Sequence, residues 1–319
     1  MQPVTTRESA LNSALGALLL AAALGFFSPM MARASESAAI VAMPSSAFTN
    51  SFFAMDIGTR GTPEAVAEML GEIGYAGLGG SGYNVKPVRQ ALEARGLRLF
   101  NVYLTLKLDP TNSALTPPMK QLITDLEGSG AALWIAVEKV LPAGDDTVAV
   151  ARLRELAGYA EARGVRIALY PHSGFWLERT SDAVRLANQL DRPGVGATFN
   201  LCHWLKVEGD LDPEPTLRAA LPRLFFVSIN GADGGDTREF KWNQLIQTLD
   251  LGSYKVGAFL QTLRRLGYTG PIGLQAYGIG GEPRDNLSRS FEAWKSLSAA
   301  AANAPHKKPL APINLRLIP

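Results

Sequence analysis

The fold is decided by the stretch EARGVRIALYPH, which occupies residues 161–172. It closes a helical pattern, because apolar side chains recur every three or four residues between Val150 and Ala160. Gly164 then precedes the apolar run Val165–Tyr170, and a glycine there lets a helix end in the left-handed conformation before a strand begins. The same joint recurs at residues 73–77, 93–98 and 266–270. The chain is therefore expected to repeat a helix–glycine–strand unit.

Eight short apolar runs bounded by Gly, Pro, Asn or Asp are the expected strands: Phe52–Ile57, Tyr75–Leu78, Leu97–Leu104, Leu133–Val137, Val165–Tyr170, Val195–Leu201, Leu224–Ile229 and Ile272–Ala276. Most are too continuously apolar for a sheet with one wet face, which favours parallel strands covered by helices. Strands and helices alternating in this number predict the α/β class and a single (β/α)8 TIM barrel. A doubly wound open sheet is the alternative, but glycines 77, 79, 80 and 82 miss the dinucleotide-binding spacing.

Both ends of the chain are predicted to lie outside the barrel. Arg7, the apolar run Ala14–Phe27 and the pattern Ala32-Arg33-Ala34 predict an export signal over residues 1–34. An uncleaved membrane anchor is the alternative, but a bilayer span needs about 20 apolar residues. We expect a linker at 35–49, the barrel at 50–298 and a Pro- and Ala-rich tail at 299–319. The sequence thus predicts an exported, periplasmic protein with no stable membrane span after signal cleavage.

Composition excludes several classes of protein. Hydrophobic residues make up 47% and charged residues 19% of the 319 residues, which is typical of a globular chain. The formal net charge of +2 provides no basic surface for nucleic acid. Cys202 is the single cysteine, so the chain has neither an internal disulfide nor a cysteine-rich zinc cluster.

Polar and aromatic side chains gather where the expected strands end, and in a barrel these carboxyl ends form the active face. Glu138, His172 and His203 are the candidate catalytic residues, because carboxylate and imidazole groups transfer protons near neutral pH. Aromatic rings and amides suit a carbohydrate, whose C–H faces stack on rings while its hydroxyls need donors and acceptors. The predicted substrate-binding residues are Tyr103, Lys107, Tyr170, Phe175, Trp176, Asn200, Trp204, Asn230, Gln275 and Tyr277.

Several of these residues also have a structural interpretation. The two histidines could be satisfied buried side chains, and Glu138 could form a surface pair with its neighbour Lys139. Trp134 could equally be part of the core. Cys202 is expected to be an inert packed thiol, because it and His203 would point to opposite faces of one strand.

Residues 164–172, 195–204, 224–230 and 270–275 resemble the xylose-isomerase-like superfamily of sugar isomerases and epimerases. The resemblance covers roughly residues 50–298. It implies a TIM barrel, a sugar ligand, and one divalent metal held by two Glu, an Asp and a His. At those four positions this chain has neutral side chains, and it keeps His172 and His203, which the resemblance implies contact the substrate. The four replacements are Tyr170, Asn200, Ser228 and Gln275.

Three functions remain open from the sequence. The first is an exported isomerase- or epimerase-like enzyme, or a related lyase, that acts on a sugar or oxidised sugar. It would use Glu138 with His172 or His203 and no cofactor, because neutral groups are poor ligands for a divalent metal. The second is a carbohydrate-binding barrel without catalysis. The third is a metal-dependent enzyme in which Glu138, His172 and His203 form a relocated metal site. All three predict a small carbohydrate as partner.

Overall fold

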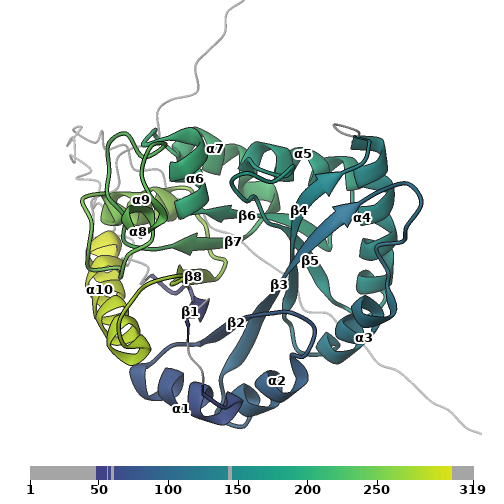
Figure 1. Ribbon diagram of the computed structural model, residues 1–319. Helices are drawn as coiled ribbons and strands as arrows, with labels where there is room; N and C mark the ends of the chain where they lie inside the picture. Colours follow the sequence, from purple (N-terminus) through teal and green to yellow (C-terminus); the bar gives the residue numbers. More distant parts are fainter. Residues whose placement is uncertain (1–47, 56, 59–60, 143–145, 304–319) are drawn as a thin grey trace, which may run out of the picture. The chain divides into compact units, whose positions relative to one another are not determined.

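The computed structural model describes residues 48–55, 57–58, 61–142 and 146–303. Within them, eight parallel strands close into a barrel in chain order, with the helices arranged around it (Figure 1). This confirms the single (β/α)8 barrel. The expected signal segment, most of the expected linker and residues 304–319 lie outside the described residues.

The strands are β1 Phe52–Met55, β2 Gly77–Ser81, β3 Arg98–Leu108, β4 Ala132–Val140, β5 Arg166–Leu169, β6 Val195–Asn200, β7 Leu224–Ile229 and β8 Ile272–Gln275. The helices are α1 Pro63–Ile73, α2 Lys86–Glu93, α3 Pro117–Leu126, α4 Asp146–Glu161, α5 Thr180–Leu190, α6 Leu201–Glu208, α7 Glu214–Ala220, α8 Trp242–Leu245, α9 Val256–Arg265 and α10 Pro283–Asn303, with a short 3-10 helix at Leu221–Arg223.

The second strand lies at Gly77–Ser81 rather than at the expected Tyr75–Leu78, and the element bounds differ from expectation in three further places. Strands β3 and β4 run further than predicted, to Leu108 and Val140, and they pair from Asn101 and Ala132 to these ends, with one register shift after Leu106. The sixth strand ends at Asn200, and α6 begins at the next residue, so the segment expected to prolong this strand is helical. Helix α10 continues to Asn303, past the expected end of the barrel domain at 298.

Aromatic side chains fill the inside of the barrel. Phe53 stacks on Phe100 with ring centroids 4.5 Å apart, and Trp134 meets Phe226 edge-on at 5.3 Å. Trp134 is fully buried, which confirms the core interpretation of this residue. Gly273 makes room for the rings, because a Cβ atom there would lie 2.7 Å from the ring of Phe53. The interior is therefore a packed core, like that of other barrels of this type.

A second core fills the space between the strands and the surrounding helices. On the outer face of the barrel, Ile135 and Leu169 belong to the same buried cluster as Leu153 and Leu156 of α4. These two leucines are part of the helical stripe seen in the sequence. Among the described helices, none is both long enough and apolar enough to cross a membrane.

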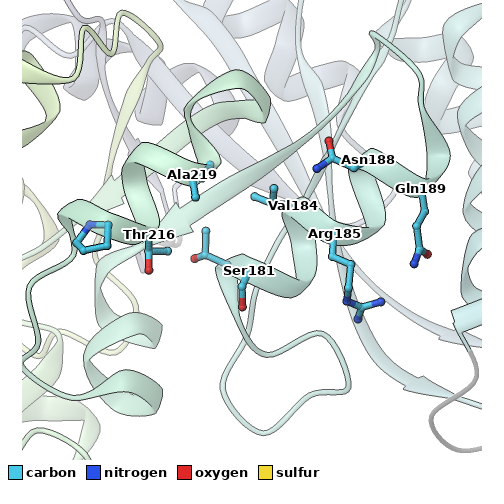
Figure 2. A pocket seen from close by; sticks show the side chains of 10 residues that line it. Ser181, Val184, Arg185, Asn188, Gln189, Thr216 and Ala219 are labelled. Atoms are coloured by element: carbon cyan, nitrogen blue, oxygen red, sulfur yellow. The ribbon is translucent and has the colours of Figure 1, made fainter. Parts of the chain in front are cut away.

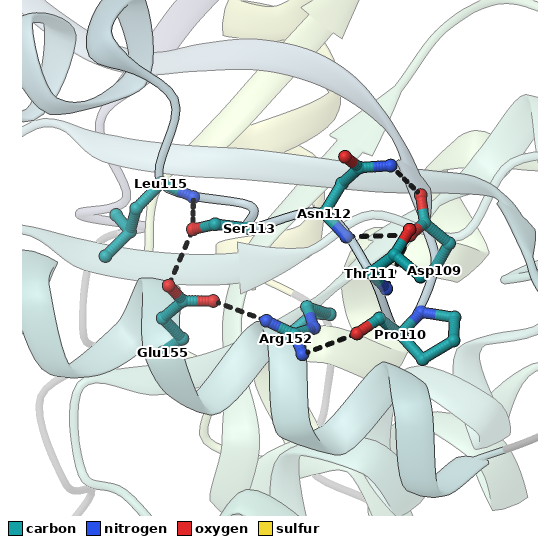
Figure 3. A network of polar contacts seen from close by, with 8 residues as sticks. All are labelled: Asp109, Pro110, Thr111, Asn112, Ser113, Leu115, Arg152 and Glu155. Carbon is teal, nitrogen blue, oxygen red and sulfur yellow. Dashed lines mark hydrogen bonds and ion pairs between the residues drawn. The ribbon is translucent and has the colours of Figure 1, made fainter.

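The loop that follows β3 is held by a polar network (Figure 3). The carboxylate of Asp109 accepts hydrogen bonds from the main-chain N–H groups of Thr111 and Asn112, each at 2.8 Å. With the side-chain hydrogen bonds from the same two residues, these contacts hold the pKa of Asp109 well below its usual value. Arg152 of α4 then joins the loop to the helix, because it donates to the Pro110 carbonyl and pairs with Glu155. The network fixes the loop beside the C-terminal ends of β3 and β4.

A methyl group at Gly196 is expected to destabilise the barrel. It would lie 2.5 Å from the Arg223 carbonyl oxygen and 2.6 Å from the Phe225 ring, so backbone or ring must move. We expect Gly196→Ala to lower the free energy of unfolding by about 1–3 kcal/mol, as overpacking does elsewhere. Gly194→Ala is the matched control, since nothing lies within 4 Å of its added methyl group. Chemical denaturation measures both, and equal stabilities would contradict the packing described here.

Candidate active site

A cavity of about 430 Å³ opens at the C-terminal ends of the strands. The side chains around it come from strands or loops far apart in the sequence, as expected for the active face of a barrel. Its lining consists of Tyr103, Tyr170, His172, His203, Trp242, Ile246, Gln275 and Tyr277. Six of these were predicted from the sequence, so the structure brings much of the candidate site together.

A larger groove of about 780 Å³ lies outside the barrel, between α5 and α7 (Figure 2). Its lining is mostly small and polar, and Arg185 is the one charged side chain of a described residue in it. That arginine already pairs with Asp146 and Asp182. No group in this groove is suited to proton transfer, so the candidate chemistry lies in the smaller cavity.

The two histidines of the cavity form a pair whose ring centroids are 4.2 Å apart. Ser173 contacts both of them through its main chain. Its carbonyl oxygen lies 2.9 Å from Nδ1 of His172, and its N–H donates to Nδ1 of His203 at 3.3 Å. A carbonyl only accepts and an N–H only donates, so Nδ1 carries the proton in His172 and lacks it in His203. In the neutral rings, Nε2 of His172 is then a free acceptor and Nε2 of His203 a donor.

Both imidazoles are held in the neutral form. Burial lowers the pKa of His172, although its hydrogen bond to the Ser173 carbonyl acts in the opposite direction. Burial also lowers the pKa of His203 well below its ordinary value, and the neighbouring His172 adds to the effect. A charged ring in this position would lose its hydration without gaining a carboxylate partner.

Aromatic rings surround the histidine pair. Phe175 stacks on His172 with centroids 4.0 Å apart, and Tyr170 and Trp242 meet His203 edge-on at 5.7 and 5.5 Å. Phe175 is not part of the cavity lining. Its ring contact with His172 is what the structure shows, and its role in binding stays a prediction.

Glu138 and Lys107 do not lie in the cavity lining, contrary to prediction. Their side chains form an ion pair of 3.2 Å and are 39% and 68% exposed. Both residues lie near the C-terminal ends of the long strands β3 and β4. The Glu138 carboxylate therefore lies at the edge of the barrel and not beside the histidines. Among the described residues, no three His, Cys, Asp or Glu side chains converge as metal ligands. The relocated metal site at Glu138, His172 and His203 is therefore not assembled.

Two predicted tryptophans pack into the outer core instead of the cavity. Trp204 was expected on a strand with His203, but both belong to α6, where successive side chains point about 100° apart. His203 therefore faces the cavity while Trp204 packs against Phe199, with ring centroids 5.3 Å apart and the ring planes tilted by 35°. Trp176 packs against the outer core, and its main-chain N–H donates to the Glu138 carbonyl. Cys202 and His203 were expected to point to opposite faces of one strand. This expectation is wrong, because both residues lie on α6.

Asn230 is fully buried and does not belong to the cavity lining, and its amide nitrogen holds a neighbouring loop. Its Nδ2 donates to the carbonyl oxygens of Gly231 and Leu245, at 2.9 and 2.5 Å. Leu245 ends α8, the short helix that carries Trp242.

Trp242 and Ile246 were missed in the sequence because they follow β7 at a distance along the chain, although the general rule for loops after barrel strands applies to them.

Comparison with known proteins places this geometry in a family. Residues 81–297 match the family described as the xylose isomerase-like TIM barrel. The chain belongs to this family. No curated protein matches it. Among solved structures, a xylose isomerase-like TIM barrel/4-hydroxyphenylpyruvate dioxygenase fusion protein is similar, with a TM-score of 0.63, 20% identity, and coverage of 78% of this chain. This chain spans only 42% of that protein's length.

Two sugar epimerases share the fold. D-allulose 3-epimerase from Methylomonas sp., solved with D-allulose, has a TM-score of 0.60 and 16% identity, over 78% of this chain and 97% of that one. A 3-keto-D-glucoside 4-epimerase from E. coli has a TM-score of 0.59 and 16% identity, over 77% of this chain and 98% of that one. At these identities the likeness extends to the fold alone.

The residues at the four positions where the resemblance implies metal ligands do not fit a divalent cation. They are neutral, and three of them are engaged in hydrogen bonds. Ser228 Oγ donates to Asn200 Oδ1 at 3.2 Å, and Asn200 Nδ2 donates to the Pro171 carbonyl at 2.9 Å. Gln275 Oε1 accepts from the main-chain N–H of Tyr277 at 3.0 Å. Tyr170 packs against Tyr103 and Trp134. A hard cation requires anionic oxygens that this set does not supply.

The stability of the protein is expected to fall between about pH 7 and pH 5, partly because of this histidine pair. The folded rings have lowered pKa values, so the unfolded chain binds more protons once the pH falls below about 6.5. The stability that the neutral pair contributes is complete above that pH and is lost progressively below it. Denaturation at several pH values should therefore show that the free energy of unfolding falls less steeply with decreasing pH in the double variant His172→Gln/His203→Gln than in the wild type.

Tyr277→Phe is the control, because it changes the same cavity without removing a group that titrates in this range. Its pH dependence should equal that of the wild type. Nitrogen-15 spectra of the histidine rings provide a second readout, with the proton on Nδ1 in His172 and on Nε2 in His203. Identical tautomers in the two rings, or equal slopes in all three proteins, would contradict the arrangement described above.

Proposed function

We propose that this protein is an isomerase or epimerase of an uncharged sugar or keto-sugar, in which His172 and His203 handle the proton without a divalent metal. The observation that carries the proposal is the contact of the Ser173 main chain with both rings. It leaves a free acceptor on one imidazole and a donor on the other, in one cavity. Acid–base transfer between carbon and oxygen atoms of a sugar needs this combination.

The lining of the cavity supports an uncharged ligand. Among the described residues it contains three tyrosines, one tryptophan, one glutamine and two neutral imidazoles, with no carboxylate, lysine or arginine. Tyrosine and glutamine provide hydrogen bonds to hydroxyl groups, and Trp242 and Tyr277 offer exposed ring surface for C–H faces. A sugar phosphate or sugar acid would lose hydration here without gaining a positive partner.

The proton transfer follows from the two tautomers. Nε2 of His172 takes the proton from the carbon next to the sugar carbonyl, and the electron pair of that C–H bond forms an enediolate. The Nε2–H of His203 hydrogen-bonds to the enediolate oxygen and stabilises its charge. Nε2 of His203 also gives its proton to the oxygen of the former carbonyl and takes the proton of the neighbouring hydroxyl, so that this second oxygen becomes the new carbonyl. The His172 imidazolium, formed beside the negative charge, then returns its proton to the neighbouring carbon, and both histidines regain their starting tautomers. Epimerisation at one carbon would need a second donor on the opposite face of the sugar.

The experiment measures exchange of the carbon-bound proton with D2O by NMR, for ketoses, aldoses and 3-keto-glucosides. We expect exchange by the wild type that persists after treatment with a chelator. His172→Gln should lower the rate by about 100-fold or more, with sugar affinity changed only a few-fold. Glu138→Gln should leave the rate unchanged, since its carboxylate pairs with Lys107 at the rim.

A carbohydrate-binding barrel without catalysis is the second candidate, because the cavity lining has no carboxylate among the described residues. Binding of a sugar without exchange of any proton would favour this second function. Loss of activity in the chelated protein would contradict the metal-free proposal. If no sugar changes the fluorescence of Trp242 or the melting temperature at millimolar concentration, both functions are wrong.

A further inference from the structure

Two arginines lie at the opposite end of the barrel from the cavity. Arg98 is the first residue of β3 and Arg166 the first of β5, so both mark the N-terminal ends of parallel strands. The guanidinium carbon of Arg98 lies 4.8 Å from the ring centroid of Phe100, and that of Arg166 lies 5.1 Å from Phe225. Arg166 is also 5.9 Å from Phe226, and Phe100 and Phe226 belong to the barrel interior. The two guanidinium groups therefore cover the phenylalanine rings at the N-terminal end of the barrel.

These guanidinium groups have no polar partner among the described residues. Neither takes part in a side-chain hydrogen bond or an ion pair, although both residues are exposed. All other arginines in the described ranges have one or the other. Nearby examples are Arg95 with Glu68, Arg192 with Glu161, Arg223 with Asp191, and Arg163 with the Tyr159 carbonyl. Two unpaired arginines at one end of the barrel are an exception that needs a reason.

The two positive charges lie close enough to affect each other. Arg166 is exposed at the surface but partly desolvated by its neighbours, which lowers its pKa, and the positive charge of Arg98 lowers that pKa further. Only the start of β4 separates them: Arg166 pairs in register with Ala132, and Nη2 of Arg98 lies 3.7 Å from the Cβ position of Gly130. Tyr268 supplies no negative charge, because burial raises its pKa well above the ordinary value and its hydroxyl donates to the Pro271 carbonyl.

We propose that Arg98 and Arg166 bind a small oxyanion, such as inorganic phosphate or sulfate, at the N-terminal end of the barrel. Each guanidinium presents parallel N–H donors that match the oxygens of such an anion. The phenylalanine rings under the two guanidinium groups keep their planes in position. A bound dianion would also remove the repulsion between the two cations. The site is independent of the proposed function, since it shares no residue with the cavity.

The test compares the melting temperature in inorganic phosphate with that in sodium chloride of equal ionic strength. We expect phosphate to raise it by about 2 °C or more, saturably, because a ligand that binds only the folded state stabilises it. Arg98→Gln and Arg166→Gln should each weaken phosphate binding at least about tenfold, measured by calorimetry. Arg95→Gln is the matched control, as it removes a paired surface arginine, and it should bind phosphate like the wild type.

A second measurement does not depend on the variants' stability. Phenylglyoxal modifies accessible arginines, and phosphate should protect Arg98 and Arg166 of the wild type while Arg95 still reacts. Equal melting temperatures in phosphate and chloride, or protection of no arginine, would overturn the site. Vesicles of phosphatidylglycerol test the other source of a phosphate group. Arginine-dependent sedimentation with these vesicles, without binding of free phosphate, would assign the arginines to a lipid surface and overturn the proposal as well.

Discussion

The aromatic filling of the barrel interior is the constraint on which the rest of the structure depends. Stacked and edge-on rings, with Phe53 and Trp134 among them, occupy the space inside the sheet, and glycines such as Gly273 give way to them. Because this interior is packed with rings, charged side chains have no room along the barrel axis. The ionisable groups of the two candidate sites accordingly lie at its two ends. The cavity lies at one end, and the arginine pair lies at the other.

The neutral residues at the metal positions and the neutral histidines depend on each other. Carboxylates in place of Asn200 and Gln275 would favour imidazolium rings, because opposite charges raise the pKa of a histidine. With amides there, burial is the largest influence on the pKa of both rings, and it favours their uncharged forms. Only uncharged rings can keep the opposite tautomers that the Ser173 main chain imposes. The neutral side chains of Tyr170 and Gln275 in the cavity lining are therefore consistent with two uncharged imidazoles beside them.

The fold could be predicted from the sequence far better than the site. Continuous apolar runs and the four helix–glycine–strand joints specify local structure, and eight strands joined by helices leave few ways to close a sheet. Side-chain direction needed more information. Trp204 follows His203 directly, and only the start of α6 at Leu201 separates their directions. Glu138 pairs with Lys107 because β3 and β4 are longer than expected. Trp242 reaches the cavity on a segment held by Asn230. Neither contact is encoded in a local sequence pattern.

The packed interior also limits how the two ends can influence each other. Coupling between sites needs an element with two arrangements that both ligands bias. Between Arg98 and Tyr103 the chain is a single strand, β3, whose neighbours pair with it and whose inward rings are buried. No second packing of those rings is evident without opening the barrel. An anion held by the arginines would therefore stabilise the whole fold, while ligand affinity in the cavity would stay the same.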